Sequence, residues 1–231
     1  MQCKRIGAMN PATLSSPEFP EKPDLPAATH PAGRALVLGS TSPYRRELLQ
    51  RLQIPFVVAA PEVDETPLPQ EAPDALAGRL ALAKARAVAR NFPQAVVIGS
   101  DQVADLNGLA LGKPGNHERA VAQLRQMRGQ TVIFQTAVAV VCLESGFEQT
   151  GLAAVRVQFR DLDDAEIENY LRAEQPYDCA GSAKSEGLGI ALLESIDSDD
   201  PTALVGLPLI RTCKMIQAAG IALLANRRAV P

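Results

Sequence analysis

Apolar residues recur along this chain with two periods, and the period changes from one segment to the next. Short continuous apolar runs are typical of buried strands. They lie at 35–38, 54–59 and 95–99. Apolar residues three or four positions apart predict amphipathic helices. Such spacing is found at 74–91, 116–128 and 208–219, and from Pro43 onward.

Two longer apolar runs in the second half of the chain alternate with polar residues, as half-buried strands do. They span 131–142 and 147–159 and are joined around Ser145-Gly146, which predicts a hairpin. Asp163 and Glu166 then have the spacing of a capping box, which predicts the start of another helix. Alternating strands and helices followed by a hairpin predict an α/β fold with a mixed sheet, and ligands at the carboxyl ends of its strands.

Length and composition indicate one globular unit with flexible ends. The chain has 231 residues, and 46% of them are hydrophobic, which is enough for one large domain or two lobes. Residues 1–33 are rich in proline and lack apolar periodicity, so we expect a disordered extension or a start site placed too early. The folded domain is expected at 34–224, with a short tail at 225–231.

Charge, cysteine content and histidine content limit the partners, location and metal that we expect. A formal net charge of −3 makes a nucleic-acid polymer an unfavourable partner and a small substrate the better expectation. The four cysteines are scattered without a Cys-x-x-Cys pair, which favours a reducing, cytoplasmic location. No apolar run has the roughly 20 residues needed to span a bilayer. With two histidines in the chain, a bound metal is expected to be Mg²⁺ or Mn²⁺ on carboxylates.

The segment from Ser40 to Arg46 has the properties of an anion site. It follows a buried strand, and Ser42 and Pro43 fit the N-cap and first position of a helix. Free N–H groups at a helix start attract phosphate, and Arg45 and Arg46 add planar charged groups beside them. An ordinary capped surface helix with two solvated arginines explains the same residues.

Three further short patterns carry charged side chains. Asp101 follows the buried run 95–99 and is the candidate catalytic residue, unless it caps a turn. Lys113, in Gly-Lys-Pro after a predicted turn at Asn107-Gly108, has the charge to neutralise a phosphate or belongs to a solvated turn. Glu65 ends the acidic stretch from Glu62, which together with Asp101 offers ligands for a divalent ion or is a solvated loop.

These motifs together resemble one family. Ser-x-Ser-Pro-x-Arg-Arg, the Glu-x-x-Glu pattern, Gly-Ser-Asp-Gln and Gly-Lys-Pro, in this order between about residues 35 and 217, are similar to the Maf family of nucleoside triphosphate pyrophosphatases. The resemblance implies a two-lobed α/β fold with a twisted mixed sheet and a central cleft, related to inosine triphosphatases. It also implies a divalent cation, a cytoplasmic homodimer, and cleavage of a nucleoside triphosphate to its monophosphate and diphosphate.

The resemblance also assigns roles to single residues. Asp101 becomes the catalytic residue that accepts the proton of the attacking water, and Glu65 joins it as a metal ligand. Phosphate binding falls to Ser40, Arg45, Arg46, Lys84 and Lys113. Lys84 lies on an alanine-rich helix, so a solvated surface lysine remains the alternative.

The run from Cys179 to Gly189 indicates the substrate. Cys-Ala-Gly-Ser-x-Lys-Ser-Glu-Gly with Ser-Asp-Gln resembles the branch of the family that hydrolyses 7-methyl-GTP, with Tyr44, Gln102 and Glu186 at the positions that set specificity. Glu186 has the chemistry to accept the N1–H and N2–H of guanine, and Tyr44 to stack on a cationic base. A packed aromatic and a solvated loop acid are their alternatives. The three glycines of the run are expected to admit a ligand close to the backbone.

Two other functions fit the same motifs less well. One is hydrolysis of dTTP and UTP, which the branch with glutamine at the position of Glu186 carries out. The other is a nucleotide-binding regulator of septum formation, in which binding rather than turnover matters. Asp101 beside metal-binding carboxylates favours an enzyme, and Glu186 with Tyr44 favours the methylated purine.

Overall fold

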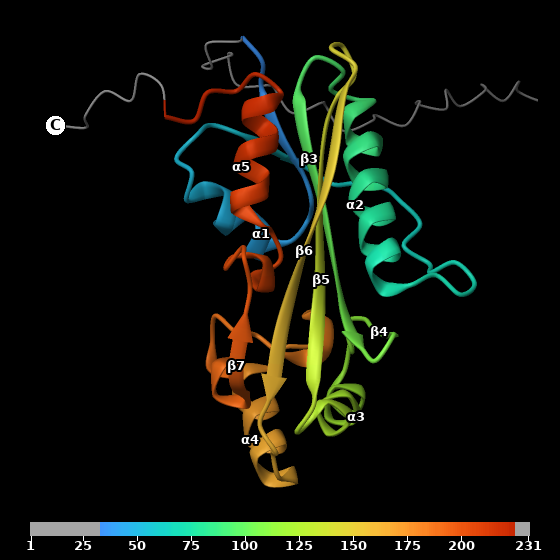
Figure 1. Cartoon of the computed structure of the whole chain (residues 1–231), viewed down its shortest axis with the longest axis vertical. Coiled ribbons are helices and arrows are strands. Elements are labelled where there is room, and N and C mark those ends of the chain that lie inside the picture. Colours follow the sequence, from blue (N-terminus) through green and yellow to red (C-terminus); the bar gives the residue numbers. More distant parts are fainter. Residues whose placement is uncertain (1–32, 225–231) are drawn as a thin grey trace, which may run out of the picture.

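One seven-stranded mixed sheet organises the protein, whose computed structural model describes residues 33–224 (Figure 1). The predicted tails at 1–33 and 225–231 therefore lie outside the described residues, apart from Gly33. The elements, in chain order, are β1 (Leu36–Gly39), α1 (Pro43–Gln50), β2 (Val57–Ala59), α2 (Pro73–Ala89), β3 (Val96–Leu106), β4 (Leu109–Leu111), α3 (His117–Met127), β5 (Thr131–Cys142), β6 (Phe147–Phe159), α4 (Asp164–Glu174), β7 (Leu193–Asp197) and α5 (Leu209–Ala218). Three 3-10 turns, η1 (Ala180–Ser182), η2 (Leu188–Leu192) and η3 (Ala203–Val205), lie between the last elements.

The sheet has the order β2-β1-β3-β5-β6-β7, with β4 paired to part of β3. β1 runs parallel to both β2 and β3, whereas the pairs β3–β5, β5–β6 and β6–β7 are antiparallel. Leu36 and Leu38 of β1 pack on one side of the sheet and Val37 packs on the other, as expected for a parallel strand covered on both faces. The predicted α/β fold with a mixed sheet is confirmed.

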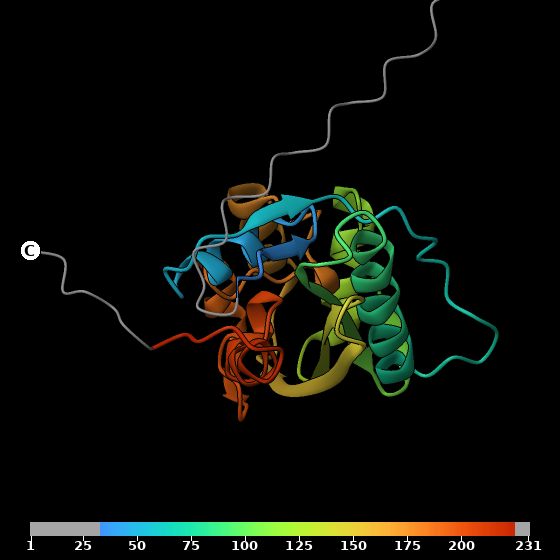
Figure 2. The same ribbon diagram turned by 90° about the horizontal axis from the view of Figure 1, so that it is seen from above.

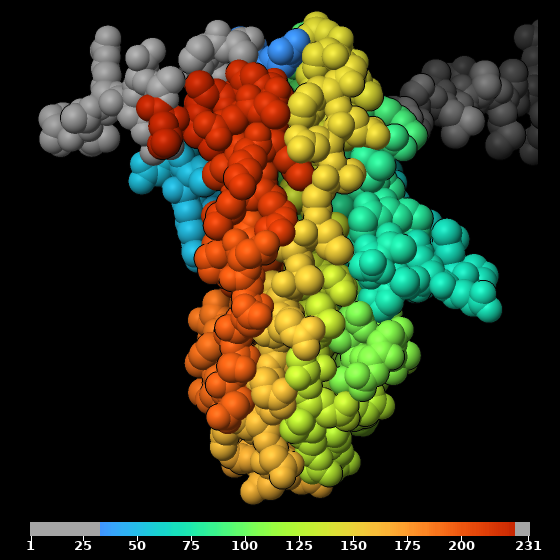
Figure 3. All heavy atoms as spheres, in the orientation of Figure 1, coloured from blue at the N-terminus to red at the C-terminus, as the bar shows by residue number. Residues whose placement is uncertain are grey.

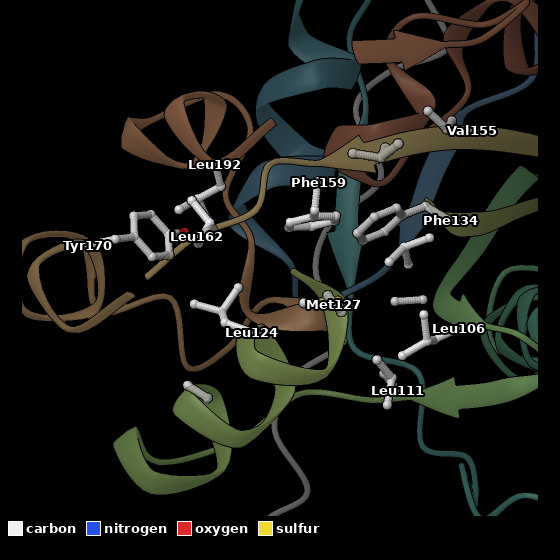
Figure 4. Packing of buried hydrophobic residues seen from close by; sticks show 14 of the residues in the cluster. Leu106, Leu111, Leu124, Met127, Phe134, Val155, Phe159, Leu162, Tyr170 and Leu192 are labelled. Carbon is white, nitrogen blue, oxygen red and sulfur yellow. The ribbon is translucent and has the colours of Figure 1, made fainter. Parts of the chain in front are cut away.

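Helices cover the two faces of the sheet at one end of the molecule. α1 and α5 pack on one face and α2 packs on the other (Figure 2). At the opposite end, α3 and α4 enclose a separate cluster in which Phe134 and Phe159 lie next to each other, with Met127 below them in the view (Figure 4). The long strands β3, β5 and β6 run through both ends, so they join the two lobes.

Most predicted elements are confirmed, because their signals are local. Asn116 caps α3 by accepting from the Arg119 N–H, and Asp163 and Glu166 form the capping box of α4. The hairpin strands β5 and β6 have the predicted bounds. β2 is shorter than predicted, and β7 was not predicted; its residues are half-buried or exposed and carry no clear alternation.

The predicted end of the third strand is wrong. β3 does not stop at Gly99 but continues to Leu106, so Asp101 lies within a strand rather than after one. The polar run Ser100-Asp101-Gln102 stays extended because its backbone pairs with residues 136–138 of β5. β1 pairs with β3 only as far as Gly99, and β4 begins its pairing at Ala104. The edge of β3 between these two neighbours is therefore open at Asp101.

Gly99 allows α2 to pack directly on β3. A Cβ atom at this position would lie 2.3 Å from the Ala81 carbonyl oxygen and 2.5 Å from the Ala85 nitrogen. Any side chain would therefore push the helix away from the strand. This close contact brings Lys84 of α2 against the open edge of β3.

A buried carboxylate shapes the segment that leads into α5. Asp200 is fully buried and accepts hydrogen bonds from the Ile210 and Arg211 N–H groups in the first turn of α5. Ser198 and Thr202 close the same turn around it. The turn η3 and Gly206 are thereby fixed beside β3, where they form one wall of the cavity described next.

Candidate active site

A cavity of about 580 Å³ opens at the unpaired edge of β3, between the two lobes. It is lined by the β1–α1 junction, the segment after β2, one face of α2, the turn after β4, the loop 178–186 and η3. The segment between β2 and α2 projects from the body of the molecule beside α2 (Figures 1 and 3). Of the predicted site residues, the cavity is lined by Ser40, Tyr44, Arg45, Glu65, Lys84, Asp101, Gln102, Lys113 and Glu186.

The β1–α1 junction has the predicted capped start. Ser42 accepts from the Arg45 N–H at 3.4 Å, Pro43 occupies the first turn, and Ser40 Oγ accepts from the Ser42 N–H at 3.1 Å. The Arg45 side chain turns into the cavity and donates from Nε to the Gly206 carbonyl at 2.8 Å. Burial lowers the pKa of Arg45, and the carboxylates of Asp101 and Glu65 act in the opposite direction.

Arg46 does not join this group. It is exposed and does not line the cavity, because one step along α1 turns its side chain about 100° away from Arg45. The structure therefore gives no support to the predicted phosphate-binding role of Arg46.

Lys84 lies at the centre of the site, and the alternative of a solvated surface lysine is wrong. Its residue is 5% exposed, and its Nζ lies 2.6 Å from Asp101 Oδ1 and 2.7 Å from Glu65 Oε1. One ammonium thus bridges two carboxylates that come from different segments. Asp101 is also buried, whereas the Glu65 side chain is 58% exposed at the cavity rim.

The surroundings of Glu65 favour its charged form. Burial alone would raise the pKa of its carboxyl group. The hydrogen bond and charge of Lys84, with the charges of Lys113 and Arg45, outweigh burial and hold that pKa below its usual value. The Glu65 carboxylate thus interacts across one cavity with three cationic side chains, each from a different segment.

Gln102 lies next to Asp101 but points to the other side of the strand. Its side-chain amide donates to Thr136 Oγ1 and to the carbonyls of Ala203 and Leu204, each at 3.0 Å. Gln102 thus ties η3 to the sheet at the cavity wall. This contact gives Gln102 a structural role, and its role in substrate specificity stays a prediction.

The far end of the cavity contains Tyr44 and the loop that carries Glu186. The Tyr44 hydroxyl lies 3.9 Å from Cys179 Sγ, and the Lys184 ammonium lies 5.9 Å from the centre of the Tyr44 ring. The Glu186 residue is exposed overall, but desolvation of its carboxyl group against the loop raises the pKa of Glu186. Burial also raises the pKa of Cys179 to about 12, so this thiol is protonated at neutral pH.

The glycines of this loop serve its own folding. A Cβ at Gly189 would lie 2.5 Å from the Lys184 carbonyl oxygen, and one at Gly187 would lie 2.7 Å from Glu174 Oε2. Neither glycine lines the cavity. The structure thus gives these two glycines a packing role, and the close approach of a ligand to the backbone of this loop stays a prediction.

The family model described as "Maf-like protein" matches residues 35–219, which is most of the chain. The chain belongs to the Maf family.

Several Maf relatives are named "7-methyl-GTP pyrophosphatase". The protein from Polaromonas sp. (strain JS666) is 79% identical over 220 residues, which cover 95% of this chain and 97% of the relative. The protein from Albidiferax ferrireducens is 74% identical over 196 residues, covering 85% and 98%. The protein from Burkholderia pseudomallei (strain 1710b) is 61% identical over 188 residues, covering 80% and 87%.

Sequence reasoning missed part of this Maf cavity. Gly206, whose carbonyl accepts from Arg45 and from Ser100 Oγ, has no side chain to signal a role. Gln123 of α3 donates to the Gly112 carbonyl and accepts from Ser182 Oγ at 2.6 Å, so it links the Lys113 turn to the loop of Glu186. A lone glutamine on an amphipathic helix gives no sequence signal for such a bridge.

The predicted metal ligands lie together but do not form a complete cation site. Between residues 33 and 224, no group of three or more histidine, cysteine, aspartate or glutamate side chains is arranged to hold a metal ion. Asp101 and Glu65 share the Lys84 ammonium and offer two carboxylates at most. This donor set fits Mg²⁺ in the way that nucleotide enzymes use it, with one or two carboxylates and the remaining ligands from phosphates and water.

Proposed function

We propose that this Maf protein hydrolyses 7-methyl-GTP to 7-methyl-GMP and diphosphate, and so removes a modified nucleotide from the pool. The observation that carries the proposal is a single cavity with an aromatic and an acid at one end and a buried Lys84–Asp101 pair at the other. The names of relatives at 61–79% identity support the same substrate. A binding-only regulator would not need this buried pair, so we favour turnover.

The triphosphate is assigned to the open edge of β3. Ser40, the start of α1 and Lys113 all line the cavity at this edge. Arg45 keeps its terminal nitrogens for phosphate oxygens, because the Gly206 carbonyl takes only its Nε. Phosphoryl transfer requires chiefly in-line positioning and cations near the oxygens that gain charge, and these three side chains supply both.

Asp101 is assigned the proton of the attacking water. Lys84 contacts Asp101 Oδ1, which holds the side chain in place beside the α-phosphorus and leaves Oδ2 to accept the proton. Glu65 contacts the same Lys84 ammonium from the cavity rim, and we assign it with Asp101 to a divalent cation. When bound by these carboxylates and the phosphates, a divalent cation would neutralise phosphate charge and polarise the P–O bonds.

The base is assigned to Tyr44 and Glu186. Guanine presents N1–H and N2–H side by side, and a carboxylate accepts both, whereas uracil and thymine offer no such pair. N7-methylation makes the base cationic, and a cation over a tyrosine face gains about 0.5–2 kcal/mol. Hydrolysis of dTTP or UTP would leave Glu186 without these donors, which argues against that alternative.

The substitution Glu186→Gln is expected to weaken base selection while chemistry continues. A hydrogen bond to a charged group contributes about 1.5–3 kcal/mol, so the preference for 7-methyl-GTP over UTP should fall by about 10- to 100-fold in kcat/KM. The value of kcat for 7-methyl-GTP should change by less than about threefold, because Glu186 interacts with Lys184, Ser185 and Glu174 rather than with Asp101 or Lys84. A diphosphate-release assay over both substrates measures the two quantities.

Glu194→Gln is the matched control, since Glu194 is an exposed acid of β7 that does not line the cavity. It should leave the preference unchanged. If Glu186→Gln and Glu194→Gln give the same preference as the wild type, Glu186 has no part in base recognition.

The other predicted partners stay predictions. Among residues 33–224, no helix is long and apolar enough to cross a membrane. We propose a homodimer in the cytoplasm on the family resemblance alone, with no nucleic-acid polymer as a partner.

A further inference from the structure

Carboxylates surround the Tyr44 ring at the base end of the cavity. Asp178 and Glu186 both line the cavity there. Asp178 Oδ1 lies 3.6 Å from Cys179 Sγ, which in turn lies 3.9 Å from the Tyr44 hydroxyl. The charges of Asp178 and Glu186 contribute to raising the pKa of Tyr44, after the larger effect of burial. The aromatic ring therefore lies in a negative field.

A cation of the protein already occupies this field. The Lys184 ammonium lies 5.9 Å from the centre of the Tyr44 ring and 2.8 Å from Glu174 Oε1. Glu174 also accepts from the Leu188 N–H at 2.8 Å, and the Lys184 N–H donates to the Tyr170 hydroxyl at 3.0 Å. The lysine is thus held beside the ring from α4 rather than free in solvent. Glu174 and Glu186 act on this ammonium, and Asp178 acts on the Tyr44 ring. The three carboxylates and the one ammonium carry a formal net charge of −2.

Glu186 alone does not explain a preference for the methylated base. GTP and 7-methyl-GTP present the same N1–H and N2–H donors, so the hydrogen bonds to Glu186 separate guanine from pyrimidines but not methylated from unmodified guanine. The negative charge of Glu186 and the face of Tyr44, in contrast, favour the cationic base. The two purines differ in a methyl group and a positive charge. A further residue that distinguishes the two purines by charge must lie near the bound base. It must also make none of the hydrogen bonds that both purines share.

We propose that Asp178 is a specificity-determining residue that attracts the positive charge of 7-methylguanine, and that Lys184 opposes this attraction. The inference rests on the proposed function, because it concerns how that site selects its substrate. Asp178 is exposed at the cavity mouth, so solvent weakens its field. Unit charges about 6 Å apart in a strongly screened medium interact by an amount that corresponds to about a 3- to 10-fold change in kcat/KM.

The test compares three substrates that separate charge from size. They are 7-methyl-GTP, GTP, and 7-deaza-7-methyl-GTP, which carries the methyl group on a neutral ring. Asp178→Asn should lower kcat/KM for 7-methyl-GTP by about 3- to 10-fold and change that of the neutral analogue by less than twofold. Lys184→Met should act in the opposite direction and raise the ratio of 7-methyl-GTP to the neutral analogue by about 2- to 5-fold. Asp178→Glu, which keeps the charge, should retain the wild-type ratio.

Asp161→Asn is the matched control, because Asp161 is an exposed aspartate that does not line the cavity. It should leave all ratios unchanged. Two results for Asp178→Asn would overturn the role of Asp178: a wild-type ratio of 7-methyl-GTP to the neutral analogue, or an equal loss of activity on both methylated substrates. A lower ratio in Lys184→Met would overturn the role of Lys184. If the wild type releases no diphosphate from any of the three substrates, the proposed function itself is wrong. If it prefers 7-methyl-GTP and Asp178→Asn keeps that preference, only this inference is wrong.

Discussion

Asp101→Asn should lower kcat for 7-methyl-GTP by on the order of 10³-fold, within the range that a positioned general base contributes. Asparagine keeps the size of the side chain and one oxygen, but it cannot accept the proton of the attacking water. Lys84 stays paired with Glu65 in this variant, so the fold and the binding of substrate should be retained. Single-turnover rates and binding of 7-methyl-GMP measure the chemistry and the binding separately.

Asp105→Asn provides the control on the same strand. Asp105 accepts from the Gly108 N–H at 2.7 Å and does not line the cavity, so its substitution should affect the β3–β4 turn without slowing turnover. An Asp101→Asn variant that retains more than a tenth of the wild-type kcat would remove the proton-accepting role from Asp101.

Lys84→Met should destabilise the fold by about 3 kcal/mol and also abolish turnover. Removal of one partner from a buried ion pair leaves the other charge without compensation, which typically costs about 3–5 kcal/mol. We place the value at the lower end, because Glu65 is largely solvated while Asp101 is buried. Methionine nearly preserves the volume of the lysine stem, so lost packing contributes little. Urea unfolding at neutral pH measures the difference.

Lys214→Met removes the same charge from an exposed position on α5 and should change the free energy of unfolding by less than about 0.5 kcal/mol. Mg²⁺ should offset part of the loss in Lys84→Met, since a cation between Asp101 and Glu65 replaces the ammonium. A loss below about 1 kcal/mol in the absence of Mg²⁺ would show that Lys84 does not compensate the two carboxylates.

The elements with local signals were predictable from the sequence. The cap at Asn116, the capping box at Asp163 and the period of β6 each depend on residues a few positions apart. The continuation of β3 past Gly99 could not be predicted, because three polar residues interrupt the apolar run. Only the pairing of these residues with β5 keeps them extended. Most residues of the site could also be predicted, since they belong to motifs that follow the order of the family's motifs.

The position of single side chains could not be read in the same way. Lys84 on an alanine-rich helix resembles a solvated lysine until Gly99 is seen to draw α2 onto β3. Arg45 and Arg46 are adjacent in sequence, yet the helical turn sends one into the cavity and the other into solvent. The placement of Lys184 beside Tyr44 depends on Glu174, ten residues away on another element. Such contacts arise from packing between distant segments, which no local pattern encodes.

Hydrolysis of 7-methyl-GTP in H₂¹⁸O tests the central claim most directly, namely that one cavity directs water to the α-phosphorus of this nucleotide. Mass spectrometry of the products should find the label in 7-methyl-GMP and none in diphosphate, with kcat/KM higher for 7-methyl-GTP than for UTP or dTTP. Label in diphosphate, release of orthophosphate with 7-methyl-GDP, or faster turnover of the pyrimidine nucleotides would contradict the account.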